Sequence, residues 1–152
     1  MNYFARCAVV FTALSLSACV TQEQKAKDAI EDYKTEVSGQ FATEAGATLF
    51  ITPVRARMVT DEALYIERHV GTGVMVRIAN ILVNKKGEIK LQALAFTSDN
   101  QWRDLRENPE LLTSLLPKDV RPAGTCDIKP AEDKNSVTFS CGGAAPEKYL
   151  RF

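Results

Sequence analysis

Apolar and polar residues follow a helical period near the start of the chain. Through residues 22–38 the apolar side chains recur three or four positions apart, at Ala26, Ile30, Tyr33 and Val37. Thr21 and Gln24 have the form of a capping box, and Gly39 follows as a stop. We therefore expect one amphipathic helix over residues 22–38. Its polar face mixes both signs of charge, which favours packing against the domain over binding to an anionic membrane surface.

From about residue 48 the pattern changes to short runs rich in β-branched residues. The predicted strands are Thr48–Ile51, Val54–Val59, Leu64–Val70, Val74–Val83, Ile89–Thr97, Gly124–Ile128, Ser136–Cys141 and Lys148–Phe152. Short polar segments separate most of them, such as Thr60–Glu62, Gly71–Gly73 and Asn84–Gly87. Because these turns are too short for crossover helices, we expect an antiparallel meander. Both faces of the strands over 64–70 and 74–83 mix apolar and charged residues, which suits a barrel or the edge of a sandwich.

A helical insertion is predicted between the fifth and sixth of these runs. Residues 99–106, with Trp102, are typical of a short capped helix, and Asn108–Pro109 begins another that Pro117 ends. The apolar side of this second helix consists of Leu111, Leu112, Leu115 and Leu116. We expect Trp102 and these leucines to cover an open end or face of the sheet. The fold class is therefore mainly β, of the α+β kind, with one helix first and a short helical insertion later.

The first residues have the pattern of an export signal. After Arg6, the run Cys7–Leu16 is apolar and uncharged, and it is too short to cross about 30 Å of hydrocarbon. The run ends in Leu16-Ser17-Ala18-Cys19, which resembles the lipobox of bacterial lipoproteins. We expect cleavage after Ala18 and lipidation of Cys19, whose diacylglyceryl and N-acyl chains together anchor a protein stably. The alternative is a buried N-terminal helix of the domain.

This interpretation divides the chain and gives it a location. Residues 1–18 form the signal peptide, 19–29 the lipidated tether and the start of the helix, and 30–152 a single domain. The second mature position is Val20 and not Asp, which resembles lipoproteins that are passed on to the outer membrane. We therefore expect a protein in the inner leaflet of the outer membrane that faces the periplasm, in contact with the membrane through its lipid anchor.

The charge balance and the cysteine count limit which partners, bonds and metal sites are expected. The 19 Lys and Arg residues balance 19 Asp and Glu residues, so we expect no nucleic-acid partner. With Cys7 removed and Cys19 lipidated, Cys126 and Cys141 remain as an even pair in an oxidising space, which predicts a disulfide. The alternative is that one of the two is a nucleophile or an attachment point. His69 is the one histidine, so the sequence predicts no metal site and no cofactor.

Several patches occur in the order found in a known family. They are Tyr33–Phe41, Pro53–Val54, Leu64–Glu67, Arg77, and Gly124–Cys126 with Cys141. Their order resembles the CpcT/CpeT family of phycobiliprotein chromophore lyases, and the resemblance implies a calycin-like antiparallel β-barrel. Arg68 stands where the family has Gln in a Tyr-x-Glu-Gln strand. The chain also ends about where family members add strands, so we expect a small barrel that is incomplete.

The candidate ligand-binding residues are Tyr65, Glu67, Arg77 and His69. Tyr65 would stack on a ligand, Glu67 would accept from pyrrole-type N–H groups, and Arg77 would pair with a ligand carboxylate. The alternative is that Glu67 and Arg77 pair with each other across adjacent strands. We expect a non-enzymatic module that holds a small apolar ligand, or that presents a face to an envelope protein.

Two other functions remain open at this point. The family resemblance implies a lyase or chaperone that places a bilin on a protein thiol, with Glu67 as the acid that protonates the chromophore. The export signal conflicts with it, because the substrates of the family are cytoplasmic. A purely structural envelope lipoprotein, with a filled barrel, is the third possibility.

Overall fold

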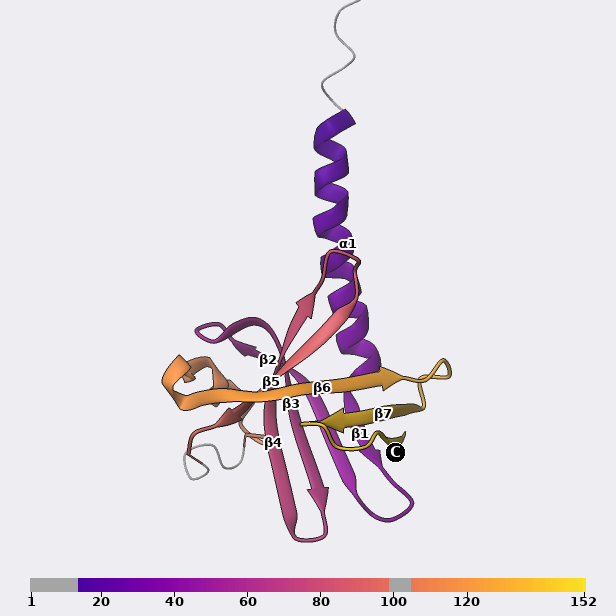
Figure 1. Ribbon diagram of the computed structural model, residues 1–152, viewed down its shortest axis with the longest axis vertical. Coiled ribbons are helices and arrows are strands. Elements are labelled where there is room, and N and C mark those ends of the chain that lie inside the picture. The colour runs from indigo at the N-terminus through magenta and orange to yellow at the C-terminus, as the bar shows by residue number, and fades with distance from the viewer. Residues whose placement is uncertain (1–13, 99–104) are drawn as a thin grey trace, which may run out of the picture.

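A computed structural model describes residues 14–98 and 105–152. One helix, α1 (Leu14–Val37), precedes a closed antiparallel barrel in which each strand pairs with its neighbours in sequence (Figure 1). The strands are β1 (Gly39–Ala42), β2 (Thr48–Ala56), β3 (Thr60–Val70), β4 (Gly73–Val83), β5 (Ile89–Phe96), β6 (Val120–Pro130), β7 (Ser136–Cys141) and β8 (Glu147–Arg151). Two 3-10 segments, η1 (Pro109–Ser114) and η2 (Pro117–Asp119), lie between β5 and β6.

The predicted antiparallel meander is confirmed, but the prediction of an incomplete barrel is wrong. The ring is completed by β1, a four-residue strand that the sequence pattern did not predict. It pairs with β2 along its length and with β8 through Phe41–Arg151 and Ala42–Leu150. With Phe41 as its one large apolar residue, β1 is too short to show an alternation.

Several boundaries differ from the predicted ones. Thr60–Glu62 begins β3 and is not a turn, and β2 runs without a break through Pro53. The helix begins at Leu14, so Thr21 lies within α1 and does not cap it. The insertion forms 3-10 helix because Pro109 and Pro117 each begin a short segment. Residues 99–104, with Trp102, lie outside the described part.

The inner face of every strand contributes to one apolar cluster that fills the barrel. Its buried members from β3 are Leu64 and Ile66, which alternate with residues on the outer face. Val37 of α1 belongs to the same cluster, and the Tyr33 hydroxyl donates to the Ile128 carbonyl at 2.9 Å. The end of α1 therefore closes one end of the barrel.

A second cluster lies on the outer face of β2 to β5. Tyr65 is its largest fully buried member, and Leu105, Leu112 and Leu115 of the insertion cover it. This confirms that leucines of the insertion cover a face of the sheet, although Leu111 and Leu116 are exposed. The two clusters explain why both faces of β3 and β4 carry apolar residues.

The seam between β1 and β8 is held by one arginine. The Arg151 guanidinium donates to the carbonyls of Ser38 and Glu36 at 2.6 and 3.0 Å, and to that of Lys134 at 3.1 Å. It also lies 4.7 Å above the ring centroid of Phe41. Because Ser38 and Glu36 belong to the C-terminal end of α1, the positive charge also complements the helix dipole.

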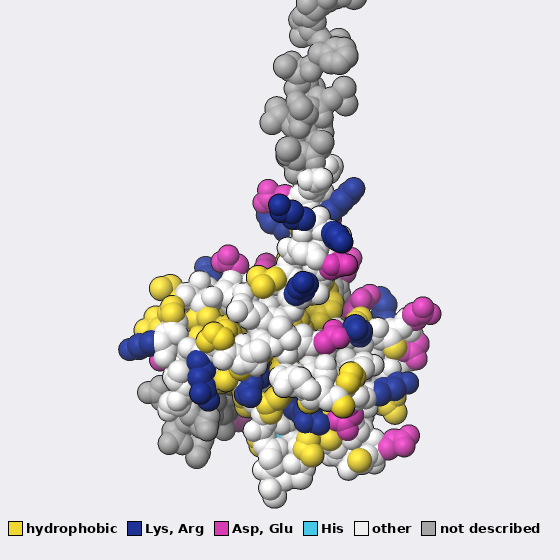
Figure 2. Space-filling model, in the orientation of Figure 1, with side chains coloured by type: hydrophobic (Ala, Val, Ile, Leu, Met, Phe, Trp, Pro, Cys, Tyr) yellow, Lys and Arg dark blue, Asp and Glu magenta, His cyan; other side chains and the backbone are white. Residues whose placement is uncertain are grey.

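The first half of α1 stands away from the barrel (Figure 1). Every side chain over residues 21–25 is exposed. Acidic and basic side chains lie along this part of the helix on the face shown in Figure 2. Lys34, nearer the barrel, forms ion pairs with Glu31 and with Glu62 at the start of β3. In the described part of the chain, no helix is both long and apolar enough to span a membrane.

Candidate functional site

A chain of three polar side chains runs along the outer face of β3. The Tyr65 hydroxyl donates to Glu67 Oε2 at 2.5 Å, and His69 Nε2 lies 2.5 Å from Glu67 Oε1. These residues share a face because they are two positions apart in a strand. The register places Phe50 of β2 and Val76 of β4 on either side of Glu67. Three of the four candidate residues are therefore brought together.

The electrostatics of this cluster keep Glu67 ionised. Burial alone would raise the pKa of Glu67, but hydrogen bonds from His69 and Tyr65 and the positive charge of Arg106 lower it below its ordinary value. Burial and the bond to Glu67 raise the pKa of Tyr65. The Arg106 guanidinium lies 4.7 Å above the ring of Phe50. Glu67 is therefore an acceptor at neutral pH and a poor proton donor.

The exposure of the cluster increases along β3. Tyr65 is only 2% exposed and meets Phe50 edge to face, which leaves no free ring face for a stacked ligand. The side chain of Glu67 is 12% exposed, whereas that of His69 is 41% exposed. Because an ionised carboxylate only accepts, His69 Nε2 is the donor of this hydrogen bond. His69 is thus the one member that is available to a partner.

A surface around the β3–β4 hairpin continues from His69. Val74 lies directly opposite His69 in the register, on the same outer face, and Val70 closes the hairpin against Gly73. Val70 and Val74 are 48% and 57% exposed. We call His69, Val70 and Val74 the hairpin surface. It lies at the end of β3 remote from Glu62, where α1 makes its ion pair, and the hairpin projects away from α1 (Figure 1).

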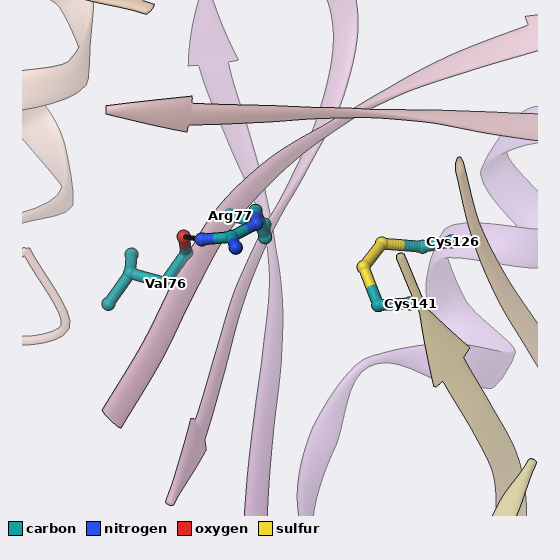
Figure 3. The surroundings of a disulfide bond; sticks show 4 residues. All are labelled: Val76, Arg77, Cys126 and Cys141. Carbon is teal, nitrogen blue, oxygen red and sulfur yellow. Dashed lines mark hydrogen bonds between the residues drawn. A yellow bond between two sulfur atoms is a disulfide. The ribbon is translucent and has the colours of Figure 1, made fainter. Parts of the chain in front are cut away.

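Arg77 is separated from the other candidates. Glu67 faces Val76 across β3 and β4, so Arg77 points to the inner face, where its register partner is the buried Ile66. Its Nη1 donates a hydrogen bond of 2.7 Å to the Val76 carbonyl (Figure 3). The predicted cross-strand pair of Glu67 with Arg77 is wrong, because the sheet lies between the two side chains.

A further polar cluster on the inner face was not predicted. Arg68 donates to the Tyr149 hydroxyl at 2.6 Å and to Glu147 Oε2 at 2.8 Å, and Tyr149 donates to the same oxygen at 2.7 Å. Hydrogen bonds from Tyr149 and Arg68 lower the pKa of Glu147. Glu147 lies one residue before the last predicted strand, Lys148–Phe152, so the sequence did not place it on a face with Tyr149, and nothing in the sequence indicated Arg68 as the partner.

The predicted disulfide between Cys126 and Cys141 is present. The two residues face each other in the β6–β7 register with their Cα atoms 4.0 Å apart, and both belong to the inner side of the barrel. Figure 3 draws the disulfide with Arg77, whose guanidinium turns toward Val76. The bond joins two strands that are already neighbours and does not span the seam between β1 and β8.

The described residues hold no group of three or more His, Cys, Asp or Glu side chains that would bind a metal ion. Comparison with protein-family models, with curated proteins and with solved structures found no match. The resemblance to the CpcT/CpeT family therefore stays a prediction from the order of short patches. Cys19 lies within α1, and its lipidation likewise stays a prediction.

Proposed function

We propose that this chain is a lipid-anchored envelope protein that faces the periplasm and binds a protein partner without catalysis. The lipobox-like segment ending at Cys19 supplies the anchor, and α1 is the spacer between lipid and barrel. At about 1.5 Å per residue, the helix over residues 19–29 would hold the barrel roughly 16 Å from the membrane surface. The exposed polar side chains over residues 21–25 of α1 suit a segment that stands in water.

The observation that carries the proposal is the exposed hairpin surface at the end of the barrel away from the spacer. Val74 exposes apolar area directly opposite a histidine that Glu67 holds in place, and Val70 is exposed at the turn of the same hairpin. Fixed polar groups next to exposed apolar side chains are typical of a binding surface. A protein tethered through residue 19 would present this end to the periplasmic space.

The packing of the barrel favours a protein partner over an enclosed ligand. The inner faces of all eight strands meet in one buried apolar cluster, while Tyr65 points outward under the insertion. Tyr65 and Arg77 thus lie on opposite sides of the sheet and would not hold one ligand together. A bilin lyase receives no support from Glu67, because a carboxylate with a lowered pKa is a poor acid at neutral pH.

The test places a photo-crosslinking residue at position 74 of the full chain in a bacterial envelope, with position 58 as the matched control. Met58 is 62% exposed but lies in the β2–β3 turn, at the α1 end of the barrel. We expect a discrete crosslink to an envelope protein from position 74, none from position 58, and loss of complex formation in a His69→Ala variant. Equal crosslinking at both positions, or none at either, would favour the structural lipoprotein.

The anchor is tested separately by intact mass. We expect the mature chain to begin at Cys19 with diacylglyceryl and acyl groups, and Cys19→Ser to remain uncleaved and without lipid. A mass for the wild type that includes Met1 and lacks fatty acids would refute the anchor.

A further inference from the structure

Three arginines share the inner side of the barrel at the end remote from α1, which we call the distal end. On β3, Arg68 follows the buried Ile66 by two positions, and on β4, Arg77 precedes the buried Ala79 by two. On β6, Arg121 precedes Ala123 by two, and Ala123 packs on the inner cluster. Alternation therefore directs all three side chains to the same side.

The register brings these arginines close to one another. Arg68 faces Met75, which is two residues from Arg77 on the same face. The pairing of β4 with β5 ends at Ile78–Leu94. One step further along the two strands, Ala95 of β5 lies beside Arg77. On its other side, Ala95 pairs with Arg121 of β6. Two strand spacings separate the Arg77 and Arg121 backbones by about 10 Å, a span that two arginine side chains can close around one small group. A methyl group is all that Ala95 places between them.

Of the three arginines, only one forms an ion pair with a described carboxylate. Arg68 is paired with Glu147, whereas Arg77 is half-buried and donates to a neutral carbonyl. The Arg121 side chain forms no hydrogen bond or ion pair with a described residue. A guanidinium has five N–H donors, so most donors of Arg77 and Arg121 are free.

We infer that the distal end of the barrel binds a phosphate-type dianion between Arg77 and Arg121. A guanidinium matches the oxygens of a phosphate group in a bidentate geometry. A phosphate monoester carries a charge of about −1.5 to −2 at pH 7, which two unpaired arginines neutralise. The group comes either from a soluble phosphate or from the headgroup of a lipid. This site lies on the inner side of the barrel, so it is distinct from the hairpin surface and does not depend on lipidation.

Glu147 should weaken binding of the anion, whereas Arg77 and Arg121 strengthen it. Its carboxylate occupies the Arg68 guanidinium and adds negative charge beside the incoming anion. Removal of this charge in Glu147→Gln frees Arg68 to contribute. Loss of Arg77 or Arg121 and loss of Glu147 therefore change the affinity in opposite directions, which a general loss of folding would not produce.

The experiment measures binding of inorganic phosphate and glycerol 3-phosphate to the full chain in a neutral detergent, by titration calorimetry at low salt. We expect saturable binding that Arg77→Gln and Arg121→Gln each weaken about tenfold, the equivalent of one charge-assisted contact. Glu147→Gln should tighten it several-fold. Arg57→Gln, at the exposed β2–β3 turn of the α1 end, is the matched control and should leave it unchanged. Circular dichroism melts verify that each variant is folded. Arg77→Lys keeps the positive charge and should retain more of the affinity than Arg77→Gln.

A second arm identifies the source of the phosphate. Vesicles of phosphatidylcholine with phosphatidic acid are compared with vesicles of phosphatidylcholine alone. Binding to the anionic vesicles that depends on Arg77 and Arg121, without binding of the soluble phosphates, assigns the site to a lipid headgroup, and the reverse assigns it to a solute. The site is refuted if neither probe binds saturably, or if Arg77→Gln and Arg121→Gln lose no more affinity than Arg57→Gln.

Discussion

Replacement of Arg151 by Ala should loosen the closure of the barrel. The side chain links β8 to the end of α1 and to the Lys134 carbonyl at the turn before β7, and it covers Phe41 of β1. The seam itself has only two residue pairs in register, compared with four between β1 and β2. Arg151 therefore supplies a large part of what joins the two ends of the ring.

The size of the effect follows from these contacts. Each hydrogen bond to a main-chain carbonyl contributes about 0.5 kcal/mol at this exposed position, below the usual range for charged donors because water competes. The exposed cation–π contact contributes about 0.5 to 1 kcal/mol more. The loss of about 2 kcal/mol in total corresponds to a fall in Tm of roughly 8 °C for a domain of this size.

Thermal unfolding followed by circular dichroism measures this difference, with Arg57→Ala as the control for loss of one surface charge. Amide hydrogen exchange gives the location, because protection should fall first at Phe41 and Leu150 on the two sides of the seam. The reasoning is refuted if Arg151→Ala lowers Tm no more than Arg57→Ala, or if exchange rises evenly over all the strands.

Three other substitutions or conditions test separate parts of the structure. Gly39→Ala should cost more than 1 kcal/mol in urea unfolding, because Gly39 has a φ of 145° and a Cβ there would lie 2.4 Å from Arg151 Nη1; an unchanged midpoint would contradict this. Reduction of the Cys126–Cys141 bond should lower the free energy of unfolding by about 3 kcal/mol, as expected for a separation of 15 residues, and a Cys126→Ser, Cys141→Ser variant should match the reduced protein. Because the folded pKa of Glu67 lies below its ordinary 4.5, its ionised form stabilises the fold above that pH. The stability advantage of the wild type over Glu67→Gln should therefore shrink as pH falls below 4.5, and an advantage that grows in acid would reverse the assigned direction.

Strand order was predictable because most strands carry a local signal. β4 and β7 match their predicted runs within one residue, and β5 within one residue at its C-terminal end. The disulfide followed from the parity of the cysteines, and its place in the β6–β7 register agrees. Closure was not predictable, because it depends on β1 and on the bonds of Arg151 to Ser38 and Glu36, which lie more than a hundred residues away in the chain.

Only the part of the candidate site that lies within one strand was predictable from the sequence. Tyr65, Glu67 and His69 share a face by their i, i+2 spacing, which the sequence shows directly. The place of Arg77 depends on the register between β3 and β4, and a shift of one residue would have moved it to the other face. The neighbours of Arg77 depend in turn on β5 and β6, which sequence spacing does not reveal.

Pairing between consecutive strands throughout the ring has a consequence for the order of assembly. Seven of the eight contacts can form as hairpins or successive additions while the polypeptide emerges, because each joins segments close in sequence. The eighth waits for the final residues, since β8 supplies it. A polypeptide released short of Glu147 would therefore retain a nearly complete sheet with two bare edges, the condition in which sheets recruit one another into aggregates.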